Sequence, residues 1–272
     1  MIMMLSLGMT AQDLPRPSPA ATVEQVVGLT TITLEYSRPS VKGRTVWGDL
    51  VPYDKVWRFG ANEATKIRTS DDITIGGEKL AARYYAILAT PSEKGEWMIH
   101  INSDTTLRGS GNYDSKKDVA VLKVKPSESA HTESLSITVE DLTANTATVL
   151  FQWEKIQIAI PVSVPTDEVA EKNIQAAIEK GEKLDQVYYS AASYYFNSKQ
   201  NEAKANEYLE ESLKVKENHR VYYLKGRMAE SKGNMTEAVG HWKKGITLAK
   251  EDGSDSWADF MQGLVDENSE KK

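Results

Sequence analysis

The sequence predicts an α+β protein with two domains, an N-terminal antiparallel β-sandwich followed by a C-terminal array of helical repeats. The 272 residues are enough for two domains of ordinary size. Short segments in which apolar and polar residues alternate fill the first part, with little helix between them, as in a sandwich. From residue 166 onward, apolar residues recur at helical spacing instead. We therefore expect the sandwich to span residues 23–164 and the helical domain residues 165–267.

The first residues resemble a secretory signal. Residues 1–9 are apolar and uncharged, and the small residues Thr10 and Ala11 follow them, so we expect a signal segment at 1–11 that is cut after Ala11. A proline-rich linker is expected over residues 12–22. This interpretation predicts an exported protein, periplasmic or extracellular. The alternative is an N-terminus that is disordered or buried in the fold.

Strands are predicted wherever the alternation is clear. Residues 31–36 alternate as a half-buried strand does, and residues 73–80 form a hairpin pattern in which Gly76 and Gly77 supply the turn. The polar residues 107–118 are predicted to form a loop. Further strands are expected at residues 84–88, 97–101, 119–124, 135–139, 146–153 and 156–162.

The helical part contains an internal repeat. Thr166 is predicted to cap its first helix, because a threonine hydroxyl there can accept an early backbone N–H. Over residues 185–251, equivalent residues recur at spacings of 34 or 33: Tyr188 and Tyr222, Ala192 and Gly226, Ala205 and Ala238, Leu209 and Trp242. This pattern resembles the tetratricopeptide repeat. The sequence therefore predicts a tetratricopeptide-like α-helical array.

Two repeats need flanking helices to cover their ends. The helix from residue 166 covers one end, and Trp257, Phe260, Met261 and Leu264 form the apolar stripe of a helix at the other. The first helix of each repeat usually lines the concave face, which suits a protein or peptide partner. The alternative is that the tyrosines only cover neighbouring helices. The candidate partner-binding residues are Tyr189, Ser193, Phe196, Tyr223, Arg227 and Glu230.

Composition excludes several functions. The formal charge of −6 argues against a general nucleic-acid binder. No apolar run is long enough to span a membrane in the mature chain. Cysteine is absent, so disulfides, thiolate metal sites and a cysteine nucleophile are excluded. The histidines are isolated and no cofactor motif occurs, so we expect neither a metal nor a cofactor; they are His100, His131, His219 and His241.

One segment carries a specific signature. It reads Tyr-Ser-Arg-Pro at 36–39, Lys-Gly-Arg at 42–44, Leu-Val-Pro-Tyr at 50–53 and Trp-Arg-Phe-Gly-Ala-Asn-Glu-Ala-Thr at 57–65. These motifs resemble the domain of unknown function 2911 family, and the resemblance extends over about residues 24–163. It implies an exported bacterial β-domain, often followed by helical repeats, to which no activity is assigned.

The same segment is a candidate binding site. Residues 38–68 hold seven basic and three acidic side chains, interleaved with aromatic residues. Cations beside flat aromatic faces suit an anionic or carbohydrate-like ligand. The alternative is that the tryptophans plug one end of the sandwich while the arginines pair with Asp49, Asp54 and Glu63. The candidate ligand-binding residues are Arg38, Lys42, Arg44, Trp47, Tyr53, Trp57, Arg58, Asn62 and Glu63.

Together these patterns favour an exported, non-catalytic binding protein. The sandwich would hold the ligand and the helical repeats a protein partner. One alternative is an envelope hydrolase that uses Glu63 as a general acid or base, although no second carboxylate accompanies it at a recognisable spacing. Another is a purely structural role, in which this loop only braces the β-domain against the helices. We assign no catalytic residue from the sequence.

Overall fold

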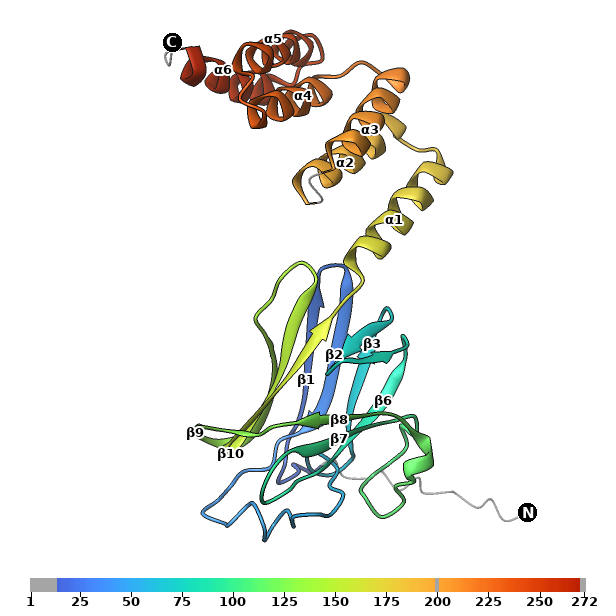
Figure 1. Ribbon diagram of the computed structural model, residues 1–272, viewed down its shortest axis with the longest axis vertical. Helices are drawn as coiled ribbons and strands as arrows, with labels where there is room; N and C mark the ends of the chain where they lie inside the picture. Colours follow the sequence, from blue (N-terminus) through green and yellow to red (C-terminus); the bar gives the residue numbers. More distant parts are fainter. Residues whose placement is uncertain (1–13, 199–200, 270–272) are drawn as a thin grey trace, which may run out of the picture. The chain divides into compact units, whose positions relative to one another are not determined.

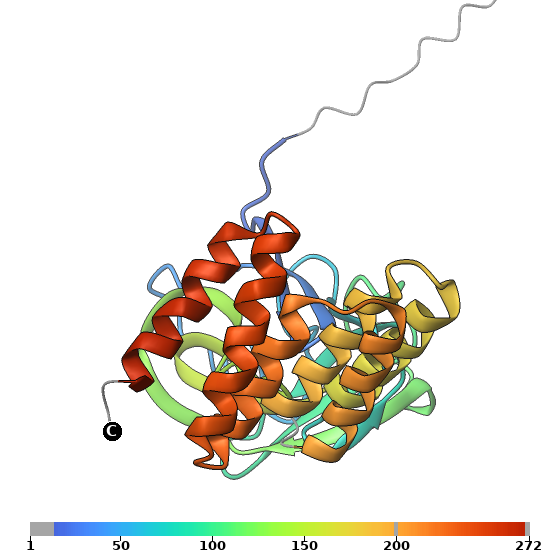
Figure 2. The ribbon, with the colours of Figure 1, turned by 90° about the horizontal axis from the view of Figure 1, so that it is seen from above.

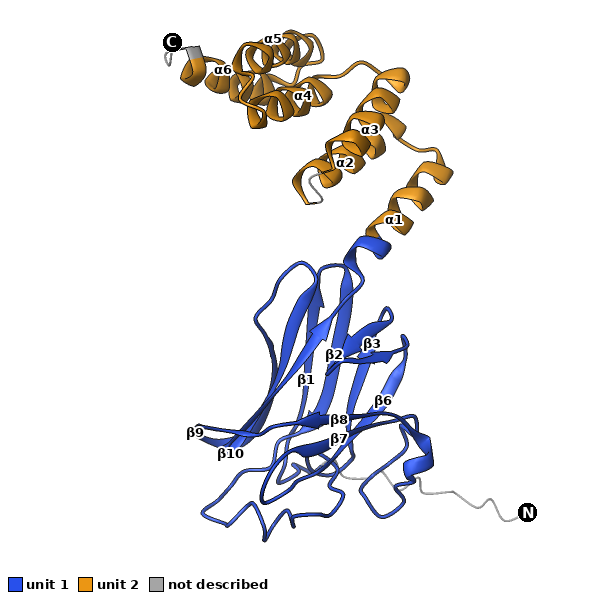
Figure 3. Ribbon diagram, in the orientation of Figure 1, with its two compact units in different colours: residues 1–169 blue, residues 170–272 orange. Residues whose placement is uncertain are grey.

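The structure is a computed structural model that describes residues 14–198 and 201–269. The chain divides into two compact units, Met1–Val169 and Ala170–Lys272 (Figure 3). Antiparallel sheets form the first unit and helices the second, which confirms the predicted α+β class. The predicted signal segment, 1–11, lies outside the described residues. No helix in the described ranges has the length and apolar character needed to cross a membrane.

The first unit contains two antiparallel sheets (Figure 1). The larger has the strand order β1-β2-β3-β6-β7-β8, and the smaller has the order β5-β4-β10-β9. The strands are β1 (Ala20–Val27), β2 (Thr30–Ser37), β3 (Thr65–Thr69), β4 (Ile73–Ile75), β5 (Glu78–Leu80), β6 (Tyr84–Thr90), β7 (Trp97–Asn102), β8 (Asp118–Val124), β9 (Ser127–Glu140) and β10 (Thr146–Ser163).

One apolar core fills the space between these sheets. Along β2 every second side chain is buried, so that Ile32 and Leu34 face inward. They belong to the same core as Ile99 of β7 and Ile137 and Phe151 of the opposite sheet. Two sheets that share one core in this way form a β-sandwich.

The structure adds two strands that the sequence pattern did not predict. β1 begins at Ala20, within the range expected to be linker, and β3 spans Thr65–Thr69. Neither shows a clear apolar alternation, because β1 lies at a sheet edge and β3 has a single large aliphatic side chain, Ile67. The two strands predicted at 146–153 and 156–162 are one strand, β10, whose pairing with β9 is interrupted on both sides of Glu154.

A tyrosine links the two sheets, and its removal is our first prediction. The Tyr36 hydroxyl donates to the carbonyl of Ile137 and accepts from the N–H of Ile137, both at 3.1 Å. We expect Tyr36→Phe to lower the free energy of unfolding by about 1–3 kcal/mol, because two buried backbone groups lose their partner. Urea unfolding measures the loss. Tyr84→Phe, which removes an exposed hydroxyl, is the control and should change stability little.

The second unit is helical. Helix α1 (Thr166–Lys180) leads into it, and the remaining helices are α2 (Leu184–Asn197), α3 (Glu202–Val215), α4 (His219–Ser231), α5 (Met235–Glu251) and α6 (Asp255–Ser269). α2 packs on α3, α4 on α5, and α5 on α6, and Figure 2 shows these helices side by side. Two apolar clusters form the core, one around Leu209 and the other around Trp242.

The start of α1 differs from the prediction that Thr166 is its cap. Thr166 is the first helical residue, and its hydroxyl donates to the carbonyl of Ala144. The N–H of Val169 bonds to the carbonyl of Pro165 instead. The hydroxyl of Thr166 therefore joins α1 to the turn between β9 and β10.

Candidate functional site

A cavity of about 290 Å³ lies at the segment that carries the sequence signature. Four candidate ligand-binding residues line it, namely Arg44, Trp57, Arg58 and Asn62. We call it the basic-aromatic pocket. Its lining consists of Ser18, Pro39, Arg44, Leu50, Val51, Trp57, Arg58, Gly60, Ala61, Asn62 and Trp153.

The half-buried Trp57, stacked on the buried Trp153, forms its aromatic wall. The rings of Trp57 and Trp153 lie 5.8 Å apart at an interplanar angle of 21°. Trp153 is 1% exposed, and the indole N–H of Trp57 donates to the carbonyl of Gly60 at 3.0 Å. Trp47 packs edge-on against both rings but does not line the pocket. The tryptophans thus belong partly to the core and partly to the pocket.

The two arginines of the pocket are held by backbone carbonyls. Nε and Nη2 of Arg44 donate to the carbonyls of Val41 and Ser40, at 3.0 and 2.5 Å. Nη1 of Arg58 donates to the carbonyls of Asn62 and Arg108, at 2.7 and 3.2 Å. Within residues 14–198 and 201–269, neither guanidinium group forms an ion pair with a carboxylate. Each arginine is therefore a fixed positive charge that no carboxylate contacts directly.

The backbone around the pocket is strained. Lys42, Asp54, Phe59 and Asn62 have positive φ angles of 50°, 58°, 51° and 57°. Such angles cost a non-glycine residue on the order of 1–3 kcal/mol and persist only where the surroundings enforce them. The Asn62 side chain does so in part, since its amide donates to the carbonyl of Ser18 at 2.9 Å. Strain concentrated in one loop is typical of binding and active sites.

Other candidate residues of this segment lie outside the pocket. Nε of Arg38 donates to the carbonyl of Leu135, and the backbone N–H of Lys42 donates to Glu133 at 2.8 Å. That backbone N–H is the main reason why the pKa of Glu133 is lowered, and Arg44 adds to the effect. Tyr53 packs beside Gly48. These residues support the loop rather than line the pocket.

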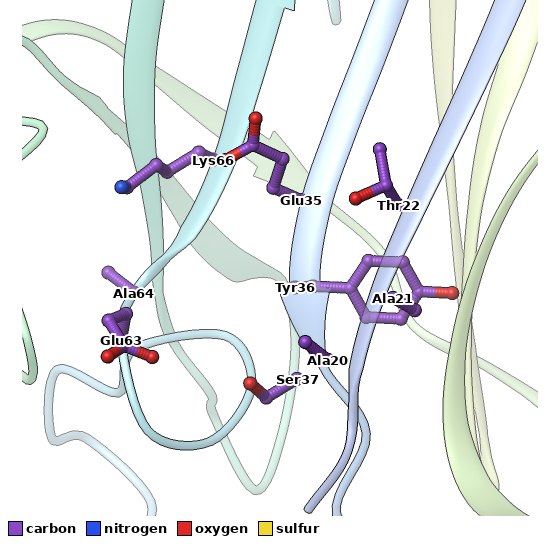
Figure 4. Close-up of a pocket in the computed structure, with 9 residues that line it drawn as sticks. All are labelled: Ala20, Ala21, Thr22, Glu35, Tyr36, Ser37, Glu63, Ala64 and Lys66. Atoms are coloured by element: carbon purple, nitrogen blue, oxygen red, sulfur yellow. The ribbon is translucent and has the colours of Figure 1, made fainter. Parts of the chain in front are cut away.

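Glu63 lines a different cavity, of about 270 Å³, together with residues of β1, β2 and β3. Figure 4 shows its carboxylate on the loop before β3, with Lys66 and Glu35 on the neighbouring strands and Tyr36 pointing away. Glu63 forms an exposed ion pair with Arg16 at 3.1 Å. A bond to its own backbone N–H lowers the pKa of Glu63, and Arg16 lowers it further. A carboxyl group that stays ionised is poorly suited to act as a general acid.

A polar network that the sequence did not predict fixes the loop between β7 and β8. His100 lies 3.1 Å from Asp118 and 2.9 Å from the hydroxyl of Thr90. The hydroxyl of Tyr113 donates to Asp118, and burial raises the pKa of Tyr113. These residues line neither cavity, so we assign the network a structural role. The same loop supplies the Arg108 carbonyl to which Arg58 donates.

In the helical unit, three aromatic residues at intervals of 34 positions lie on every second helix. They are Tyr189 on α2, Tyr223 on α4 and Trp257 on α6. Burial raises the pKa of Tyr189, and nearby Tyr223 adds to the effect. The rings of Tyr223 and Trp257 are 5.3 Å apart, and Phe260, which is 50% exposed, lies 5.7 Å from Tyr223. We call these four residues the aromatic ladder.

The remaining partner-binding candidates have contacts within their own helices or with the core. Arg227 forms an ion pair with Glu230 at 2.9 Å, and Ser193 accepts from the Asn197 side chain. Phe196 packs against the core around Leu209. The sequence assigned the aromatic residues of α6 to a capping stripe only, although the 34-residue spacing to Trp257 signals that they continue the ladder.

In the described part of the chain, no group of three or more histidine, aspartate or glutamate residues is placed to hold a metal ion. Comparison with known proteins gives one match: the family described as "Protein of unknown function (DUF2911)" matches residues 18–162, which is more than half of the chain. No curated protein and no solved structure matches.

Proposed function

The chain belongs to the DUF2911 family of proteins of unknown function, and we propose that it is an exported, non-catalytic binding protein. In this proposal the basic-aromatic pocket takes an anionic or carbohydrate-like ligand, and the helical unit holds a protein partner. The observation that carries the first part is the pair of guanidinium groups, fixed by backbone carbonyls beside an aromatic wall.

Charge is the main physical argument. Arg58 is half-buried, so its guanidinium group is partly desolvated, and an anion that pairs with it offsets that cost, whereas Arg44 is exposed. The carbonyls that hold Arg44 and Arg58 satisfy some donors of each group without cancelling its charge. Because the protein itself supplies the fixed geometry, an anion that binds there orders few side chains, which favours affinity.

The proposal is tested by ligand titration of the intact protein. The probes are acetate, phosphate, glucuronate and glucose, and the fluorescence of the pocket tryptophans reports binding. We expect at least one anion or sugar to give a saturable change that the double variant Trp57→Ala, Arg58→Ala loses. Lys55→Gln, which removes an exposed charge of the same segment, is the control and should bind as the unchanged protein does. A folded double variant that retains every response would overturn the proposal.

The aromatic ladder supports the proposed partner site. Its four side chains combine large apolar area with little rotamer entropy to lose, which is why aromatic residues dominate many interfaces. Selection of peptides from a displayed library, with counter-selection on a folded Tyr223→Ser, Phe260→Ser variant, tests it. Peptides that bind both proteins equally would contradict a role for the ladder.

Export is proposed from the sequence alone. The N-terminal residue of the protein recovered outside the cytoplasm tests it. Cleavage after Ala11 is expected, whereas recovery of a chain that keeps Met1 would contradict the proposed signal segment.

A further inference from the structure

We infer that the ligand of the basic-aromatic pocket is a small carboxylate carried on an apolar, ring-sized body, and not a neutral sugar. The inference rests on the proposed function and narrows its ligand class. Three properties of the pocket carry it: the balance of hydrogen-bond donors and acceptors, the chemistry of the walls, and the volume.

The lining favours an anion over a neutral hydroxylated ligand. It includes two arginines and no aspartate or glutamate. Two carbonyls at the pocket already accept bonds, that of Gly60 from Trp57 and that of Asn62 from Arg58. A sugar presents hydroxyl groups that must donate as well as accept, and only Ser18 and Asn62 carry acceptor oxygens among the lining side chains, so some of these hydroxyl groups stay unpaired. A carboxylate only accepts, and therefore fits this balance.

The walls favour an apolar body behind the charged group. Pro39, Leu50 and Val51 line the pocket together with Trp57 and Trp153. Leu50, which is 41% exposed, and the half-buried Trp57 offer apolar surface to a ring of the ligand, whereas Trp153, Val51 and Pro39 are themselves buried. A body covered with hydroxyl groups would lose hydration there without gaining partners.

The volume suits one ring of the ligand inside the pocket. The cavity of about 290 Å³ lies at the lower end of the roughly 300–1,000 Å³ typical of small-molecule sites. Such a space holds a substituted six-membered ring. The site therefore suits a small acid, or the acidic end group of a longer molecule whose remainder lies outside.

A carboxylate also fits better than a phosphate. Arg44 and Arg58 have each committed two donor bonds to carbonyls, so only the remaining N–H groups of each planar fork can face a ligand. A singly charged, planar carboxylate needs few donors, so the N–H groups that remain can satisfy it. A phosphate dianion has more charge to desolvate beside the apolar walls and more acceptors to satisfy.

The test compares matched ligands on the full-length protein by calorimetry. Benzoate and cyclohexanecarboxylate are the probes, benzamide is the uncharged match for benzoate, and glucose, glucuronate and phenyl phosphate represent the other classes. We expect benzoate to bind at least tenfold more tightly than benzamide and glucuronate. This comparison uses the unchanged protein and does not depend on whether a variant folds.

Variants then place the ligand in the pocket. Arg44→Gln and Arg58→Gln should each weaken benzoate binding about tenfold or more, because each removes a charge-assisted bond. Arg58→Lys keeps the charge without the planar guanidinium group, so its affinity for benzoate should lie between those of Arg58→Gln and the unchanged protein. Lys55→Gln is the control with no change in affinity. Near-ultraviolet circular dichroism of the tryptophans shows that each variant is folded.

The outcomes separate this inference from the proposed function. The inference would be overturned if glucuronate, glucose or phenyl phosphate bound more tightly than benzoate and the arginine variants lost that binding. The same result would support the proposed function. Benzamide binding as tightly as benzoate would overturn the role given to the carboxylate. No binding of any probe, including acetate and phosphate, would overturn both. If the Arg44→Gln and Arg58→Gln variants fold and bind benzoate with unchanged affinity, benzoate does not bind in the basic-aromatic pocket.

Discussion

Replacement of Trp153 by alanine is expected to lower the free energy of unfolding of the sandwich by about 3–5 kcal/mol, the range for a fully buried large aromatic residue. Trp153 is 1% exposed, and its ring contacts Trp47 and Trp57 with centroid distances of 5.7 and 5.8 Å. The aromatic cluster is rigid, so the cavity left by the indole cannot close fully. Urea unfolding followed by tryptophan fluorescence measures the loss.

A matched pair of phenylalanine variants separates ring volume from hydrogen bonding. The indole nitrogen of Trp153 is buried and has no hydrogen-bond partner in the described structure, whereas that of Trp97 donates to the carbonyl of Ser92 at 3.1 Å. Both rings are almost fully buried. We therefore expect Trp97→Phe to destabilise the protein more than Trp153→Phe, by about 0.5–1.5 kcal/mol, the net worth of one hydrogen bond. Equal losses would contradict this assignment.

The position of Trp153 also explains a limit of sequence-based prediction. The pattern ends a strand at this residue and starts another at Ile156, because the alternation of apolar residues shifts phase between them. In the structure the strand continues, and irregular pairing at Glu154, which has a φ of 56°, absorbs the shift. A bulge changes which face a side chain occupies, and a two-residue period alone does not distinguish it from a break.

The candidate site was predictable in composition but not in geometry. Clustering of arginines and tryptophans in one loop predicted a site for an anionic or carbohydrate-like ligand, and Arg44, Trp57 and Arg58 line one pocket. Glu63 is in the same motif, yet positive φ angles at Phe59 and Asn62 turn the chain so that it lines another cavity. The sequence also did not indicate that carbonyls rather than carboxylates hold the arginines, because every residue carries a carbonyl.

In the helical unit, Gly226→Ala is expected to destabilise the protein by about 2 kcal/mol although alanine is the better helix former. A Cβ atom at this position would lie 2.1 Å from Nε1 of Trp242, a fully buried ring. Alanine gains about 0.5–1 kcal/mol over glycine within a helix. Overpacking against a rigid ring costs about 1–3 kcal/mol, or more where the overlap is severe, so the steric cost prevails. Thermal unfolding followed at 222 nm measures the loss.

Gly240→Ala provides the matched control, since it makes the same change within helix α5 where, apart from the adjoining helix backbone, nothing lies within 4 Å of the added Cβ. This variant should be more stable than the unchanged protein by about 0.5–1 kcal/mol. If both alanine variants are stabilised, Gly226 is not in contact with Trp242. In a Trp242→Leu background, Gly226→Ala should cost much less stability than it does in the unchanged protein. The effects of residues in contact are not additive.

The first repeat shows why alanine is expected to be tolerated at position 226 when leucine replaces Trp242. Ala192 and Leu209 occupy the positions equivalent to Gly226 and Trp242, and both are fully buried. A leucine leaves space for the Cβ of an alanine on the facing helix, whereas a tryptophan requires its absence. Both repeats thus place a small residue on the first helix and a large one on the second, and the larger tryptophan is matched by the smaller glycine. Leu209→Trp should therefore be tolerated better in an Ala192→Gly background than alone, which a double-mutant cycle measures directly.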